Sequence, residues 1–77
     1  MVDWHMLHAV MEAEYELFER RADGVLNWRG LVQGLAAARV RTRLLAIETD
    51  NEVYALRSLD RVVVARVAAD ERAAEAA

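Results

Sequence analysis

The chain of 77 residues contains no cysteine, no proline and no lysine, and it has only three glycines. Without cysteine, the protein can form neither disulfides nor thiolate metal sites. Without proline, and with glycine only at positions 24, 30 and 34, nothing after Gly34 breaks a helix through its backbone chemistry. These absences favour a helical protein that is held together by packing.

The shortness of the chain limits the core that it can build. A domain of this size buries only roughly 60% of its unfolded surface, and small proteins without disulfides or metals commonly gain stability from a partner subunit. The hydrophobic fraction of 56% is high for so short a chain, against an average of about 45–50%. We therefore expect some apolar surface to be covered by another polypeptide.

Long apolar runs are also missing. No stretch approaches the ~18 uninterrupted apolar residues of a membrane span, and no basic segment precedes an apolar one at the start, as it does in a signal peptide. We expect a cytoplasmic protein with no membrane partner.

Apolar spacing predicts an all-α fold, a three-helix hairpin or bundle completed by oligomerisation. The first segment has apolar residues every three or four positions, the spacing of a helix seam. Asp23-Gly24 is typical of a helix end, and Asn27 of a helix N-cap. The expected helices cover about residues 2–22, 27–47 and 50–74 of a single helical domain over 1–77, and the seam residues are Trp4, His8, Met11, Tyr15, Phe18 and Ala22.

The second expected helix has two apolar faces. Trp28, Leu31 and Leu35 form the early face. The later residues Val40, Leu44 and Ile47 lie about 120° around the helix from that face, at 100° per residue. A helix of this kind is predicted to contact two neighbours.

An alternative fold remains open for the second half of the chain. Valine density and local alternation also allow a small α+β structure, because short valine runs do not separate strand from helix by pattern. The strands of this alternative lie near 43–48, 53–57 and 61–67.

Arginine is concentrated in the middle of the chain. Residues 20–43 contain six arginines and one acid, although the whole chain has a net charge of −3 and a pI near 5.3. Such a cluster permits binding to nucleic-acid phosphates, but dedicated binders are usually basic overall. The hypothesis of a small nucleic-acid-associated regulator uses Arg29, Arg39, Arg41 and Arg43.

Two charged residues fall inside apolar arcs of the expected helices. Glu14 lies in the apolar arc of the first helix and Arg39 in that of the second. A semi-buried ion pair between them would fix the register of the two helices, because either charge left alone is costly.

Gly30 and Gly34 are four residues apart and would lie on one helix face. Glycine in a helix costs up to about 1 kcal/mol relative to alanine. One interpretation is a small-residue face that lets another backbone approach closely; the other is that both glycines are merely tolerated.

Candidate chemistry is sparse. His5, His8, Glu12 and Glu16 would share one broad side of the first helix, and imidazole with carboxylate suits zinc or iron, so a metal-binding helical dimer is a further hypothesis. There is no cysteine nucleophile, and Ser58 is the only serine. We expect no enzymatic activity and no cofactor.

The sequence thus predicts a non-enzymatic interaction or assembly subunit, whose partner is a second copy or another protein. The candidate interface residues are Trp4, His8, Met11, Tyr15, Phe18, Trp28, Gly30, Gly34, Val40, Leu44 and Ile47.

Overall fold

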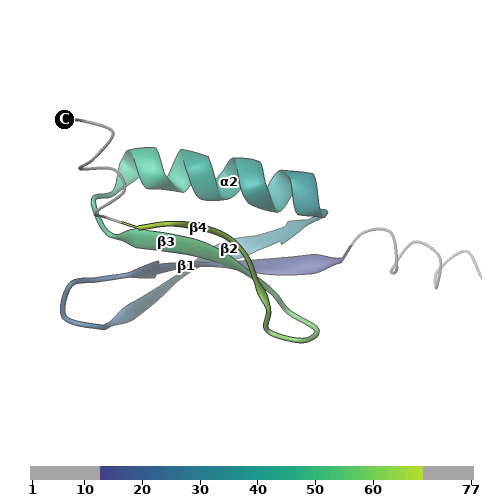
Figure 1. Cartoon of the computed structure of the whole chain (residues 1–77), viewed down its shortest axis with the longest axis horizontal. Helices are drawn as coiled ribbons and strands as arrows, with labels where there is room; N and C mark the ends of the chain where they lie inside the picture. Colours follow the sequence, from purple (N-terminus) through teal and green to yellow (C-terminus); the bar gives the residue numbers. More distant parts are fainter. Residues whose placement is uncertain (1–12, 69–77) are drawn as a thin grey trace, which may run out of the picture.

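The computed structural model describes residues 13–68 of the chain. These residues form a four-stranded antiparallel sheet with one helix packed on one of its faces (Figure 1). The elements, in chain order, are β1 (Glu14–Arg20), β2 (Leu26–Gln33), α2 (Leu35–Glu48), β3 (Glu52–Arg57) and β4 (Val63–Val67).

The sheet has the strand order β2-β1-β3-β4. β1 lies in the interior of the sheet and pairs antiparallel with both β2 and β3. β2 and β3 therefore run in the same direction on either side of β1, and α2 connects them across one face. The result is two hairpins joined by a helical crossover.

The prediction of an all-α three-helix bundle is wrong. Residues 14–20 form a strand because their burial alternates with a period of two, with Tyr15, Leu17 and Glu19 all buried. The segment 27–47 divides into most of β2 and most of α2, and the segment 50–74 contains β3 and β4. The expected seam does not form one surface, because Tyr15 and Phe18 are three residues apart and therefore lie on opposite faces of the strand.

The alternative α+β fold is partly correct. β3 and β4 confirm the strands expected near 53–57 and 61–67, and the strand expected near 43–48 is wrong because these residues belong to α2. Thr42 and Leu45 are both buried three positions apart, which is helical rather than strand spacing.

Asp23 and Gly24 form a hairpin turn and not the helix end that the sequence predicts. The Arg21 N–H donates to the Val25 carbonyl at 2.9 Å, which closes the turn. Gly24 has φ 88°, a conformation that favours glycine. The Asp23 carboxylate accepts the Val25 N–H at 3.0 Å. Asp-Gly is a strong signal for a hairpin when strands flank it.

Gly30 lies at a β-bulge in β2. Leu17 pairs with Gly30 and the next residue, Phe18, pairs with Trp28, so Arg29 is the additional residue. Gly30 has φ 130° and Gly34, between β2 and α2, has φ 92°. A Cβ atom at either position would meet nothing within 4 Å. The expected small-residue helix face is therefore wrong: these glycines supply backbone conformation, not close packing.

Replacing Gly30 with alanine is expected to lower the free energy of unfolding by about 2 kcal/mol, because an L residue is strained at this φ. Leucine at the same position should cost about as much as alanine, since the space around the Cβ is open. A chain synthesised with D-alanine at position 30 is the matched control and should retain stability. Denaturant unfolding measures all three; a tolerated alanine together with a disruptive leucine would support close packing instead.

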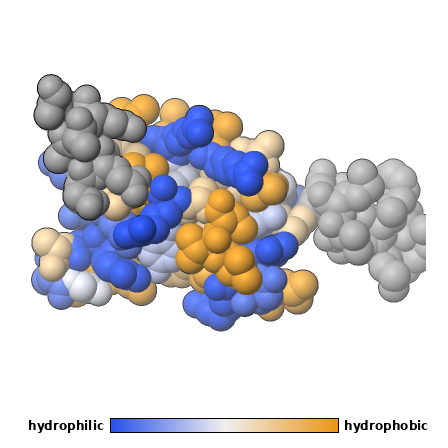
Figure 2. Space-filling view, viewed as in Figure 1, coloured by the Kyte–Doolittle hydropathy of each residue, from blue (hydrophilic) through white to orange (hydrophobic). Residues whose placement is uncertain are grey.

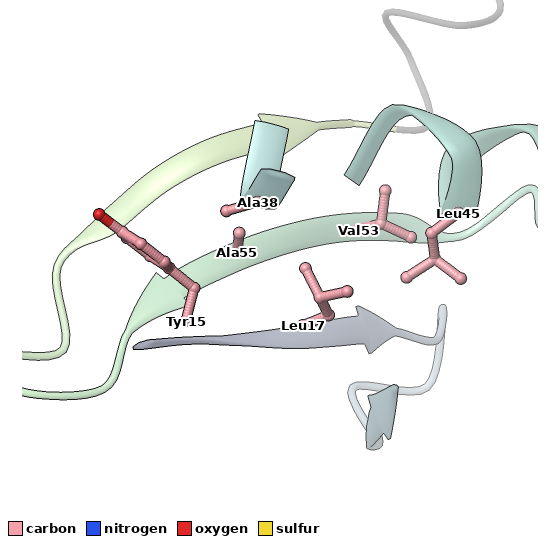
Figure 3. Packing of buried hydrophobic residues seen from close by; sticks show 6 residues of the cluster. All are labelled: Tyr15, Leu17, Ala38, Leu45, Val53 and Ala55. Carbon is pink, nitrogen blue, oxygen red and sulfur yellow. The ribbon is translucent and has the colours of Figure 1, made fainter. Parts of the chain in front are cut away.

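The hydrophobic core lies between the sheet and α2. The helix presents Ala38, Thr42 and Leu45 to the sheet, and the Thr42 hydroxyl donates to the Ala38 carbonyl at 2.7 Å. Figure 3 shows side chains from β1 and β3 pointing toward those of the helix. The core cluster consists of Tyr15, Leu17, Ala38, Leu45, Val53 and Ala55.

Candidate functional site: the open face of the sheet

The sheet has a second face that α2 does not cover. Side chains of a strand alternate between the two faces, and Tyr15 and Leu17 of β1 belong to the core beneath the helix. Glu16 and Phe18 therefore point to the opposite side. We call this side the open face.

The pairing register arranges the residues of the open face in four rows that run across the strands. The bulge at Arg29 resets the alternation in β2, so that Trp28 and Leu31 both lie on the open face. From one end of β1 to the other, the rows are Gln33–Glu14; Leu31–Glu16–Leu56–Val63; Trp28–Phe18–Tyr54–Arg66; and Leu26–Arg20–Glu52.

Apart from Glu16 and Arg66, the two middle rows form an apolar patch with contributions from all four strands. At its centre Tyr54 and Leu56 are buried, at 9% and 6% exposure, and Phe18 is half-buried. At its edges Trp28, Leu31 and Val63 are about half exposed. Figure 2, seen from the edge of the sheet where β4 lies, shows a hydrophobic area (orange) with hydrophilic surface (blue) around it. Large exposed apolar patches with a polar rim commonly mark interaction sites.

The aromatic side chains of the patch are held in place by one another. The rings of Phe18 and Tyr54 are stacked, with centroids 5.5 Å apart and an interplanar angle of 23°. The Arg20 guanidinium lies over the Tyr54 ring at 5.7 Å from its centroid, in the range of a cation–π contact. The centre of the patch is therefore preorganised, and Trp28 at its edge is the large aromatic side chain most available to a partner.

Charges of both signs border the patch. Glu52 accepts a two-pronged contact from Arg66, at 3.0 and 2.7 Å, and lies 3.6 Å from Arg20. At the other end Glu16 lies 3.9 Å from Arg61, whose side chain is 69% exposed. Exposed pairs of this kind contribute little stability, so their role is to define the polar rim of the open face.

Glu19, near the end of β1, lies on the side of the sheet opposite the open face and joins several elements through hydrogen bonds. Its carboxylate accepts hydrogen bonds from Arg29 at 2.7 Å, Thr49 at 2.5 Å and Asn51 at 2.8 Å. The residue is 5% exposed. Hydrogen bonds from Thr49 and then Asn51, together with the Arg29 guanidinium, hold the pKa of the Glu19 carboxyl below its ordinary value of 4.5, against the opposing effect of burial.

The cluster of Glu19, Arg29, Thr49 and Asn51 lies on the side of the sheet opposite the open face. It holds the strands that carry the open-face residues in position. Arg29 is the residue added by the bulge, and its second terminal nitrogen lies 3.5 Å from Glu48 at the end of α2. Glu19 therefore ties β1 to the bulge of β2 and to the loop between α2 and β3. The same bulge sets the position of Trp28, so the cluster couples the helix end to the apolar patch.

The described part of the chain brings together no metal-binding group. Residues 13–68 contain no cluster of three or more potential histidine, cysteine or carboxylate ligands. Of the metal-ligand candidates, Glu16 lies on the open face, whereas His5, His8 and Glu12 lie outside the described residues.

The expected interface residues occupy several places in the structure. Phe18 and Trp28 are neighbours on the open face. Tyr15 is 4% exposed and belongs to the core, so the chain itself covers it. Val40, Leu44 and Ile47 are exposed on the outer side of α2, the second apolar face that the sequence predicts. Trp4, His8 and Met11 lie outside the described residues.

The predicted ion pair between Glu14 and Arg39 does not form in the described structure. Glu14 lies on the open face, and Arg39 lies on α2 on the other side of the sheet. The expected arginine cluster is also divided. Arg39 and Arg43 line a groove beside β4. Arg29 and Arg41 line a separate groove that includes Leu17, and Arg29 also pairs with Glu19.

Sequence reasoning missed Tyr54, Leu56 and Val63 as part of a surface, and it missed Glu19 as a structural carboxylate. The usable signals were the alternation in EYELFER and the Asp23-Gly24 turn signal between two apolar stretches. Together they predict a hairpin of β1 and β2, with Phe18 and Trp28 on one face.

The fold and the site define a class: a two-layer α+β protein of two hairpins and one crossover helix, with a largely apolar open sheet face. No protein-family model, no curated protein and no solved structure matches the chain. Within the part of the chain that the structure describes, no helix is long and apolar enough to cross a membrane.

Proposed function

We propose that this protein is a non-enzymatic interaction or assembly subunit that binds a protein partner through the open face. The observation that carries the proposal is the apolar patch, in which half-exposed Trp28 and Leu31 of β2 lie across β1 from the buried Tyr54 and Leu56 of β3. Within residues 13–68 no element covers this face. Burying apolar side chains of this size is worth about 25 cal/mol per Å², which favours a partner.

The composition of the patch also supports a protein partner. Tryptophan, tyrosine and arginine are enriched among residues that dominate binding energies, and Trp28, Tyr54 and Arg66 lie in one row. A charged rim around an apolar centre is the usual anatomy of a protein interface. The cytoplasmic location belongs to the proposal and rests on the sequence.

The proposal is tested by comparing Trp28→Glu with Ile47→Glu in the full chain. Both residues are exposed, but Ile47 lies on the outer side of α2 and is 82% exposed. Proteins retained by the tagged wild-type chain, including untagged copies of itself, are identified and their binding is repeated with purified components. We expect binding to fall at least tenfold with Trp28→Glu and less than twofold with Ile47→Glu. Equal binding by the two variants, or no binding partner for the wild type, would contradict the proposal.

A further inference from the structure

The arrangement of charges on the open face allows its partner to be specified, and this inference rests on the proposed function. We propose that the partner is a second copy of the chain, stacked face to face about a twofold axis that runs across the strands. β1 of one protomer then lies over β1 of its partner in the opposite direction. Packed sheets keep their strands within about 30° of alignment, so rows of the two protomers correspond.

The charges along β1 distinguish this arrangement from its parallel counterpart. The open face of β1 carries Glu14 and Glu16 toward its start and Arg20 at its end. In a parallel stack each glutamate would face the same glutamate of its partner, which is unfavourable in a water-excluded interface. In the antiparallel stack Glu14 faces Arg20 of the partner at both ends.

Both charges are available for this contact. Glu14 is exposed, and in the described structure its side chain makes no ion pair. The side chain of Arg20 is 52% exposed and its nearest acid, Glu52, lies at 3.6 Å. The interface would therefore give Glu14 and Arg20 each a new ion-pair partner. It would not break a strong existing ion pair.

The apolar rows match in the same arrangement. The twofold axis exchanges the second and third rows, so Leu31 faces Trp28 of the partner and Leu56 faces Tyr54. In the same exchange Glu16 faces Phe18 of the partner and Val63 faces Arg66. Each contact occurs twice, as a twofold interface requires. The open face of one protomer therefore contacts the open face of its partner, and the two surfaces are identical.

The same features disfavour single-stranded nucleic acid, which would stack its bases on exposed aromatic rings. Tyr54 is 9% exposed, and its ring contacts Phe18 and Arg20. Glu14, Glu16 and Glu52 place three acids on the face that phosphates would approach. A self-complementary protein surface fits these charges better.

The size of the open face sets the expected affinity. The four strands are five to eight residues long. At about 4.8 Å between strands and about 3.3 Å per residue they cover roughly 400 Å² in projection. A standard interface buries about 800 Å² on each partner. The dimer is therefore expected to be weak and to dissociate on dilution.

Sedimentation of the full chain over a wide concentration range tests the inference. We expect a reversible monomer–dimer equilibrium. Glu14→Arg and Arg20→Glu should each weaken it at least tenfold, and the double variant should recover most of the loss. Thermal unfolding at low concentration controls for folding, which matters for Arg20→Glu because it places a second acid beside Glu52.

Cross-linking tests the direction of the stack, and the absence of native cysteine makes it specific. Copies with Glu14→Cys are mixed with copies carrying Arg20→Cys and treated with a short bismaleimide. We expect mixed cross-links to form at least tenfold faster than links between identical copies. Faster links between identical copies would overturn the antiparallel arrangement.

Other outcomes overturn the inference and separate it from the proposed function. A chain that is monomeric at every concentration, but binds a different purified protein in a Trp28-dependent way, removes the self-association and leaves the proposed function standing. Monomers that dimerise only after removal of residues 1–12 would identify that segment as the occupant. Trp28-dependent binding of a single-stranded oligonucleotide by the monomer would contradict both.

Discussion

Replacing Glu19 with alanine is expected to lower the free energy of unfolding by about 3 kcal/mol, a large part of the stability of a domain of this size. Hydrogen bonds to a charged group contribute about 1.5–3 kcal/mol, and a donor left unpaired costs more. The Glu19 carboxylate accepts hydrogen bonds from Arg29, Thr49 and Asn51, so alanine leaves all three donors without this acceptor. Because the Arg29 side chain is 37% exposed and can be hydrated in the variant, the loss stays at the lower end of that for a buried ion pair, about 3–5 kcal/mol.

The matched control for Glu19→Ala is Glu16→Ala, on the same strand but on the open face. Glu16 has only a 3.9 Å contact with the exposed Arg61, and loss of such a pair costs about 0.5 kcal/mol. Glu19→Gln keeps the shape of the side chain and should cost about half as much as alanine. Urea denaturation at low protein concentration measures all three, and equal effects of Glu19→Ala and Glu16→Ala would show that the cluster is not structural.

The pH dependence provides a second readout of the same cluster. The folded-state pKa of Glu19 is below its ordinary value of 4.5, so the unfolded chain binds the proton more readily. The contribution of Glu19 to stability is therefore complete above about pH 4.5 and is lost as the pH falls through the folded-state pKa. Wild type should lose stability over this range, and Glu19→Gln should lose less.

Replacing Leu45 with alanine is expected to cost about 3 kcal/mol, whereas replacing the adjacent Leu44 should cost about 0.5 kcal/mol. Leu45 is 7% exposed in the core cluster and Leu44 is 49% exposed on the outer side of α2. Leucine-to-alanine changes in a core cost about 2–5 kcal/mol, and exposed positions usually stay within about 0.5 kcal/mol.

The pair of leucine variants also distinguishes the observed fold from the helical bundle that the sequence suggests. In the bundle, Leu44 is a packed residue together with Val40 and Ile47. A larger cost for Leu44→Ala than for Leu45→Ala, measured by unfolding of the monomeric chain, would therefore contradict the orientation of α2. Measurement below the dimerisation range is essential, because an interface at the helix would also make Leu44 costly.

The second half of the chain was the more predictable part. Val40, Leu44 and Ile47 share one side of α2, as their three-and-four spacing predicts. Their role as an interface stays a prediction. β3 and β4 were available as an alternative because valine and tyrosine are favoured in strands. The predicted end of this helix near residue 47 is one residue from its observed end at Glu48. What the local pattern did not predict is that the loop after it is held by Glu19, thirty or more positions away.

The first half was wrong for a different physical reason. A glutamate-rich segment without proline has high helix propensity, and propensity is overridden when strand pairing buries more apolar surface. Gly30 contributed to the error, because a glycine in a helix and a glycine in a bulge look alike in sequence. Only the pairing of Leu17 with Gly30 and Phe18 with Trp28 reveals the bulge.

The sequence by itself determined that the chain has no disulfide, that its charge is acidic overall with arginine as the only strong cation, and that its hydrophobic fraction of 56% is high for its length. Each of these follows from composition, which does not depend on which residues are neighbours in the folded chain. The tertiary structure alone decided that Phe18, Trp28, Tyr54 and Val63 lie on one surface and that Glu19 is buried. These residues come from four different strands or bind across long sequence separations, so their proximity is a consequence of sheet register and not of local spacing.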